Sequence, residues 1–190
     1  DLKARVAVFL VNDPDCEAAA GEPVAGMSGG ETMTFYGRWV YKFEEAARRG
    51  AIAALVVHET EGAGYGWNVV QAPAGENFNV VLGPDARQPV LLQGWIQGSL
   101  FAELLKNAGH DFATVKRQAR TKAFRPIDLN ATLSADSAVD LTRLTSRNVI
   151  GKLTGSRYPN ETVSYSGHWD AYGIGPADAQ GRTIRPGAAD

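Results

Sequence analysis

Cysteine is nearly absent from this sequence of 190 residues, which contains a single one, Cys16. One cysteine excludes an internal disulfide framework and any zinc site built from several thiolates. Asp13, Asp15 and Glu17 surround it, and neighbouring negative charge disfavours the thiolate that a reactive cysteine needs. We therefore expect Cys16 to be an unreactive thiol in a loop.

The sequence also lacks a long apolar run and an excess of positive charge. No apolar stretch approaches the roughly 20 residues that cross a bilayer, and no basic segment followed by an apolar one stands at the N-terminus. The formal net charge is -2, whereas nucleic-acid binding depends on a clustered positive field. We expect neither a membrane nor a nucleic acid among the partners. Hydrophobic residues make up 44% of the chain, which is enough for a packed core.

The first half of the sequence alternates between apolar runs and an amphipathic segment. Residues 5–11 (RVAVFLV) and 51–58 (AIAALVVH) are apolar runs typical of buried strands. Between them, residues 38–49 predict a helix that ends at Gly50. Its apolar face contains Val40, Phe43, Ala46 and Ala47. A strand, a helix and a strand in this order indicate an α/β fold.

The pattern continues after a long irregular stretch. Residues 89–95 predict a third strand, and residues 99–106 and 112–120 predict two helices. The first of these helices has a stripe of Leu100, Leu104 and Leu105 and is closed by Gly109. Residues 59–89 are rich in Gly, Pro and Asn, and a structureless loop of that length is uncommon. We expect them to form a functional lobe or to carry short strands.

A second unit begins near Pro126. After this residue the helical periodicity gives way to alternating, strand-like patterns at residues 131–133, 148–153 and 161–168. We therefore divide the chain into a domain of residues 1–125 and a second part of residues 126–190.

The most specific local pattern is His168-Trp169-Asp170, at the end of the predicted strand 161–168, with Asp190 following at the end of the sequence. Ligands gather at strand ends in open α/β sheets, and imidazole nitrogen and carboxylate oxygen both suit Zn²⁺. Asp170 would point the same way as His168 in strand geometry, which suits a carboxylate that orients a metal ligand. A lone His-x-Asp is more often a hydrogen-bonded histidine at a strand end. The strand, the spacing and the sequence GAAD at 187–190 together favour a metal site.

These segments resemble a known family. Residues 161–170 (ETVSYSGHWD) and 185–190 (RPGAAD) resemble the opening motif of the co-catalytic, two-zinc aminopeptidases, which include bacterial leucyl aminopeptidases and the glutamate carboxypeptidases. Residues 1–125 resemble the protease-associated domain of such enzymes, with YGR at 36–38 and EEAARRGA at 44–51. The resemblance covers nearly the whole chain.

The resemblance implies an α/β fold, an activity and a set of site residues. It identifies His168 as the first zinc ligand, Asp170 as the ligand-orienting aspartate and Asp190 as the carboxylate that bridges two Zn²⁺ ions. It implies a periplasmic or secreted exopeptidase that hydrolyses N-terminal residues from peptide substrates. The family also needs an adjacent Glu-Glu pair, a later Asp and a final His beyond Asp190. We therefore expect this chain to be a truncated fragment of the enzyme, without activity or stably bound zinc of its own.

Other patterns are less specific. His58-Glu59-Thr60-Glu61-Gly62 lacks the second histidine of a His-Glu-x-x-His zinc helix. Gly62, Gly64 and Gly66 do not complete a phosphate-binding loop. The basic side chains between residues 116 and 125 are expected to form a solvated helix face with a structural role.

Two alternatives stay open at this stage. Tyr65, Trp67 and Trp95 either form an exposed aromatic surface or cap a core, and their exposure separates these two interpretations. The alternative function is a non-catalytic module in which the domain of residues 1–125 binds a peptide or a partner protein.

Overall fold

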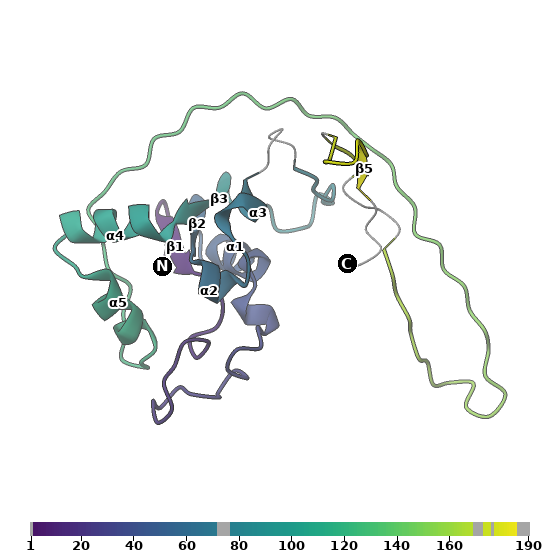
Figure 1. Ribbon diagram of the computed structural model, residues 1–190, viewed down its shortest axis with the longest axis horizontal. Helices are drawn as coiled ribbons and strands as arrows, with labels where there is room; N and C mark the ends of the chain where they lie inside the picture. The colour runs from purple at the N-terminus through teal and green to yellow at the C-terminus, as the bar shows by residue number, and fades with distance from the viewer. Residues whose placement is uncertain (1, 72–76, 169–172, 176, 186–190) are drawn as a thin grey trace. The chain divides into compact units, whose positions relative to one another are not determined.

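The computed structural model describes residues 2–71, 77–168, 173–175 and 177–185 (Figure 1). The chain divides into two units, residues 1–137 and 138–190, and each is described by itself. The first is a mixed α/β unit around a three-stranded parallel sheet, and the second contains a two-stranded antiparallel sheet. Within the described ranges, no helix is long and apolar enough to cross a membrane.

The parallel sheet of the first unit is formed by β1 (Val6–Leu10), β2 (Ala53–His58) and β3 (Leu92–Gln97), in the order β1-β2-β3. All three strands were predicted from apolar runs, and β3 begins three residues later than predicted. The central strand β2 is almost entirely buried, because β1 and β3 pair with it on its two sides and both of its faces are covered.

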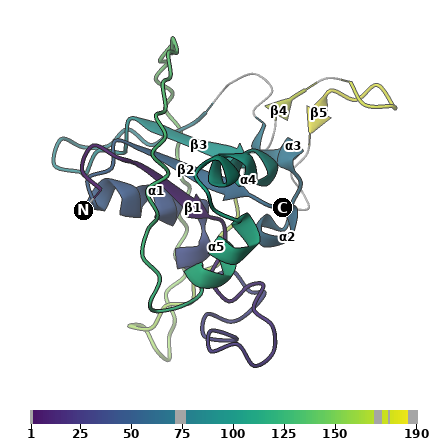
Figure 2. The same ribbon diagram turned by 90° about the vertical axis from the view of Figure 1, so that its left-hand side faces the viewer.

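Helices cover the two faces of this sheet (Figure 2). Alternate residues of β2 point to opposite faces, as strand geometry requires. Ala54 and Val56 pack with Phe43 of α1 (Trp39–Arg48) in one apolar cluster. Val57 packs with Leu105 of α4 (Gly98–Asn107) in the other cluster, which α5 (Phe112–Ala119) also joins. The unit therefore has a small helix-sheet-helix architecture.

Glycine ends the helix α1, as the sequence predicts. The N–H of Gly50 donates to the carbonyl of Ala47 at 3.1 Å, and the N–H of Ala51 donates to the carbonyl of Ala46 at 3.0 Å. Gly50 has a φ of 82°, which glycine adopts without steric cost. This pair of hydrogen bonds is the Schellman arrangement, and Gly109 ends α4 in the same way.

The predicted apolar faces of the helices are partly wrong. In α1, Phe43 and Ala46 are buried but Val40 is exposed. In α4, the buried residues are Phe101 and Leu105, whereas Leu100 and Leu104 are exposed. Phe101 and Leu105 are one turn apart and meet the sheet along a single line. The leucines one position earlier therefore lie on the neighbouring line, which faces away from the core.

Two short helices, rather than strands, follow β2. They are α2 (Thr60–Ala63) and α3 (Trp67–Val70), and the described residues between 59 and 89 contain no strand. Gly62 and Ala63 of α2 are buried, whereas α3 buries none of its residues. The prediction of short strands in this stretch is thus wrong, because its apolar residues after position 77 find no paired strand and are exposed.

The strands predicted at residues 131–133, 148–153 and 161–168 are also not formed. Every one of these residues is irregular and exposed. A strand is stable only when a neighbouring strand takes up its backbone hydrogen bonds. Asp128 and Leu129, within the first unit, still contact its folded part, Asp128 through an ion pair with Arg5 at 3.3 Å and Leu129 through packing on the second apolar cluster.

The described residues of the second unit form one short hairpin. The strands β4 (Gly173–Ile174) and β5 (Ile184–Arg185) pair in antiparallel fashion. Their turn is stabilised by Asp178, whose carboxylate accepts hydrogen bonds from the backbone N–H groups of Gln180 and Arg182.

Candidate functional site

The predicted zinc ligands lie in the second unit, and only one of them falls within the described residues. His168 is exposed and in irregular backbone, so the prediction that it follows a strand is wrong. The strand is absent because residues 161–168 have no pairing partner. Asp170 and Asp190 lie outside the described residues. The assignment of these three residues therefore remains a prediction.

The hairpin β4–β5 lies between His168 and Asp190 in the sequence. It pairs Gly173 with Arg185 and Ile174 with Ile184. His168 precedes the paired Gly173 by five residues, and Asp190 follows the paired Arg185 by five residues. The hairpin thus reverses the chain direction between the two predicted ligands. Each ligand is five positions from the ladder pair Gly173–Arg185.

A metal site is not formed by the part of the chain that the structure describes. Among these residues, no three or more His, Cys, Asp or Glu side chains are grouped so that they could hold a metal ion. Two of the three predicted site residues are outside this set, so the finding concerns the rest of the chain, including the acidic residues of the first unit.

Buried polar residues gather in the first unit where β1 ends. Asn12, Asp13 and Asp15 are all buried. Asp13 accepts hydrogen bonds from the backbone N–H and the hydroxyl of Thr34, at 2.7 and 2.9 Å. The side chain of Asn12 donates to the carbonyl of Gly62 in α2 at 2.8 Å. These contacts fix the long loop between β1 and α1 to the edge of the sheet.

Asp15 fixes a second part of the same loop. Its Oδ2 accepts the backbone N–H groups of Ser28 at 2.7 Å and Gly30 at 3.1 Å. The N–H of Ser28, followed by that of Gly30, lowers the pKa of Asp15 although burial acts against it. The other oxygen, Oδ1, is buried without a partner among the described residues. Asp15 therefore serves as the internal anchor of the loop.

Gly37 and Lys42 lie against the buried residues Asp13 and Asn12. A side chain at Gly37 would meet Oδ2 of Asp13 at 2.8 Å and the side chain of Met33 at the same distance, so only glycine fits there. Lys42 donates from Nζ to the carbonyl of Asn12 at 3.0 Å. Burial lowers the pKa of Lys42, and the charge of Asp13 opposes this effect.

The basic side chains between residues 116 and 125 are solvated only in part: Arg117, Lys122 and Arg125 are exposed, as predicted, whereas Lys116 and Arg120 are not. Lys116 and Arg120 are one turn apart, and their side chains are only 17% and 13% exposed. Lys116 Nζ lies 2.7 Å from Glu17 and 2.8 Å from Glu59, and Arg120 pairs with Glu17 at 3.2 Å and with Glu22 at 3.1 Å. The structural role predicted for this stretch is confirmed for these two residues. The prediction of a solvated face is wrong for Lys116 and Arg120, because acidic side chains more than 50 residues away in sequence reach the helix.

This five-residue network, Glu17, Glu22, Glu59, Lys116 and Arg120, joins three parts of the chain: the loop after β1, the end of β2 and the helix α5. Burial acts against the charge of Lys116, but hydrogen bonds with Glu17 and Glu59 outweigh it and raise the pKa of Lys116. Glu22 has a lowered pKa, first because the N–H of Ala19 donates to it and further because Arg120 does.

A cavity of about 540 Å³ lies beside this network. It is lined by Asn12, Cys16, Glu17, Glu31 and Glu61, so its polar surface is mainly acidic. Burial raises the pKa of the half-buried Cys16 thiol, and Glu17 raises it further. The expected disfavouring of the thiolate is thus confirmed, with burial as a larger cause than the neighbouring carboxylates.

His58 is buried among three aromatic rings at the end of β2. Its ring lies 5.7 Å from that of Tyr65, 5.5 Å from that of Trp67 and 5.8 Å from that of Trp95. All three aromatic residues are half-buried, so they cap a core instead of forming an exposed surface. Nε2 of His58 is buried without a hydrogen-bond partner among the described residues, and the nearly perpendicular rings of Trp67 and Trp95 suit a weak N–H to π contact.

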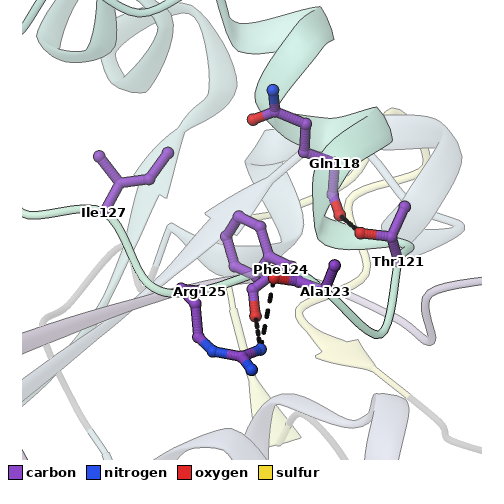
Figure 3. Close-up of a pocket in the computed structure, with 6 residues that line it drawn as sticks. All are labelled: Gln118, Thr121, Ala123, Phe124, Arg125 and Ile127. Carbon is purple, nitrogen blue, oxygen red and sulfur yellow. Dashed lines mark hydrogen bonds between the residues drawn. The ribbon is translucent and has the colours of Figure 1, made fainter.

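A smaller cavity of about 260 Å³ lies after α5 (Figure 3). It is lined by Gln118, Thr121, Ala123, Phe124, Arg125 and Ile127. Arg125 turns back onto its own segment and donates to the carbonyl of Phe124 at 2.8 Å. The guanidinium therefore stabilises the turn that follows α5.

No protein-family model, curated protein or solved structure matches this chain. The fold class is therefore established as mixed α/β by the structure alone. The identification of residues 1–125 as a protease-associated domain, and of the motif at residues 161–190 as a zinc site, remain hypotheses.

Proposed function

We propose that this chain is part of a zinc-dependent exopeptidase that removes N-terminal residues from peptides. Residues 1–125 would form its protease-associated domain, and residues 126–190 would contribute the first metal ligands of its catalytic domain. The proposal rests on the resemblance of ETVSYSGHWD and RPGAAD to the two-zinc aminopeptidases. The parallel three-stranded α/β unit in the first part of the chain is compatible with it.

The observation that carries the proposal is the hairpin β4–β5. A separation of 22 positions would let two side chains lie up to about 75 Å apart in an extended chain. The hairpin lowers this limit to about 40 Å, because each predicted ligand is only five positions from the ladder pair Gly173–Arg185. The hairpin is therefore compatible with a shared metal site for His168 and Asp190.

The donor set fits zinc in its chemistry. An imidazole and a carboxylate are among the ligands that Zn²⁺ prefers, and His168 and Asp190 supply one of each. Asp170 would accept a hydrogen bond from the imidazole of His168 and so fix the ring and its tautomer. Zinc, when bound, supplies a Lewis acid that polarises the peptide carbonyl and activates water. The resemblance assigns the remaining ligands and the general base to residues that follow position 190.

The test is hydrolysis of aminoacyl-p-nitroanilides by the full-length gene product. A chelator should abolish the activity and added Zn²⁺ should restore it, while His168→Ala should lower kcat/KM by at least about a thousandfold, since a lost ligand removes transition-state stabilisation. Bound zinc, measured by atomic absorption after dialysis, should fall in the same variant. This second measurement reports on ligation without depending on turnover.

His110→Ala is the matched control for this experiment. His110 follows α4 in the first unit, and its backbone N–H donates to the carbonyl of Leu105. A change at its side chain removes a histidine without touching the predicted ligands, so activity and zinc content should both stay at the wild-type level. If His168→Ala retained both, the zinc assignment would be wrong.

A second candidate function is a peptide- or protein-binding module, which an exposed aromatic cluster favours. Phe35 and Tyr36 of η1 (Phe35–Gly37) are both exposed and meet Tyr41 of α1 with ring centroids 5.6 and 4.9 Å apart. Aromatic residues are enriched in protein interfaces. If the full-length protein showed no hydrolysis with any metal but retained a partner that Phe35→Ala and Tyr36→Ala together release, this second function would replace the first.

A further inference from the structure

We propose that the ion-pair network of Glu17, Glu22, Glu59, Lys116 and Arg120 is a latch that holds residues 16–22 against α5 and so limits access to the half-buried Cys16 thiol. The latch joins the loop after β1 to α5 and to the end of β2. Glu17 belongs both to the latch and to the cavity wall. Opening of the latch would therefore move a wall of the cavity.

The geometry of the network gives it this role. Glu17 is shared by two cations, since its Oε2 lies 2.7 Å from Lys116 Nζ and 3.2 Å from an Arg120 nitrogen. All five side chains are at most one-third exposed, so each charge is partly removed from water and depends on its partners. Removing Arg120 leaves Glu22 without a cation, removing Lys116 leaves Glu59 without one, and in either case Glu17 keeps only one of its two cations. The loop can relieve this by moving its carboxylates into water.

The rest of the loop between residues 16 and 22 has few other attachments to α5. Its backbone hydrogen bonds are local, from Cys16 to Asp13, from Ala18 to Asp15 and from Glu22 to Ala19. Asp15 holds the loop from the other side, through Ser28 and Gly30. Breaking the latch should thus open residues 16–22 locally, while the sheet and the Asp15 anchor stay intact.

Cys16 is a built-in reporter of this opening because it is the only cysteine and is half-buried. Lys116 and Arg120 lower the pKa of Cys16, although burial and Glu17 raise it more. Loss of either cation would therefore slow the reaction of an exposed thiol, because less thiolate would form. Faster labelling after such a substitution must come from opening, since the direct electrostatic effect has the opposite sign.

The experiment measures the rate at which iodoacetamide, an uncharged reagent, labels Cys16 in the 190-residue chain. Arg120→Gln and Lys116→Gln should each raise the rate by about tenfold through local opening. Circular dichroism and thermal unfolding of each variant, recorded under the labelling conditions, distinguish local opening from global unfolding. A rate that is unchanged or lower in both folded variants would overturn the latch.

Arg117→Gln is the matched control on the same helix. Arg117 is exposed and donates to the hydroxyl of Thr114, and it takes no part in the latch. Its substitution removes one positive charge from α5 and should leave the labelling rate unchanged. An equal rise in this variant would mean that net charge, and not the latch, controls access to the thiol.

A salt series on the unsubstituted protein tests the latch without any substitution. Raising sodium chloride from about 50 mM to about 1 M should increase labelling by about threefold, because salt screens the ion pairs of the latch, although less than it would screen fully exposed pairs. The double variant Lys116→Gln with Arg120→Gln should have lost this salt dependence. If the double variant kept it in full, the latch would be wrong even where single substitutions had caused unfolding.

Discussion

Residues 53–58 and residues 148–153 have similar strand-like sequences but opposite outcomes. The first segment, AALVVH, forms the central strand β2, in which Val56 is 0% exposed. The second, NVIGKL, remains irregular, and Ile150 is 90% exposed. The first segment has a strand on each side and a helix against each face. The difference shows that apolar character makes a segment suitable for a sheet, whereas neighbouring strands decide whether it enters one.

The largest test of this comparison places the same charge in both segments. Val56→Asp should destabilise the first unit by more than about 4 kcal/mol, because it buries an unpaired carboxylate in a packed core. Ile150→Asp should change the free energy of unfolding by less than about 0.5 kcal/mol, since the side chain is already in water. Urea unfolding, followed by the fluorescence of the tryptophans near the sheet, measures both.

The matched substitutions Val56→Ala and Ile150→Ala separate burial from charge. The first should still cost about 2 kcal/mol, because it leaves a cavity in the core, and the second should again have little effect. An Ile150→Asp variant as unstable as Val56→Asp would show that residues 148–153 pack into a core, and the contrast between the two segments would disappear.

The fold of the first unit was largely predictable because local and long-range signals agree there. The apolar runs gave all three strands, and Gly50 and Gly109 gave the helix ends. The exposure of Leu100 and Leu104 was not predictable, because this helix has apolar residues on two neighbouring lines. Its apolar pattern therefore does not define how it is rotated against its sheet. That rotation is set by the partner surface, which the sequence of the helix does not contain.

The candidate sites show the same division between local and long-range information. The pattern His168-Trp169-Asp170 could be found in the sequence because the residues are adjacent, but the hairpin β4–β5 between His168 and Asp190 could not. The latch was missed because Glu17 and Lys116 are 99 positions apart. The available signal was the i, i+4 spacing of Lys116 and Arg120. This spacing places two cations on one helix face, where carboxylates are the expected partners.

A medium effect is expected from the glycines, which also differ between the two regions. Gly50 has a φ of 82° at the end of α1, a conformation that costs other residues about 1 kcal/mol or more. Gly50→Ala should destabilise the first unit by about that amount. Gly151→Ala is the control, because this glycine lies in the irregular region with open space around it. Thermal unfolding of both variants measures the difference, and equal shifts would contradict the role of Gly50 as a helix end.

The smallest expected effect is a pH dependence of the stability of the first unit. The pKa of Glu22 is lowered by the N–H of Ala19 and by Arg120. A carboxyl group with a lowered pKa in the folded state stabilises that state above its unfolded pKa of about 4.3. This stabilisation is lost as the pH falls through the lower, folded value.

The experiment measures the free energy of unfolding between neutral pH and about pH 3. In Glu22→Gln this free energy should fall less steeply with acid than in the unsubstituted protein. Glu161→Gln, an exposed change in the irregular region, should leave the steepness as it was. A slope that Glu22→Gln did not alter would mean that the hydrogen bonds to this carboxylate persist in the unfolded chain or do not form in the folded one. Either result would remove Glu22 from the contacts that distinguish the packed region from the irregular one.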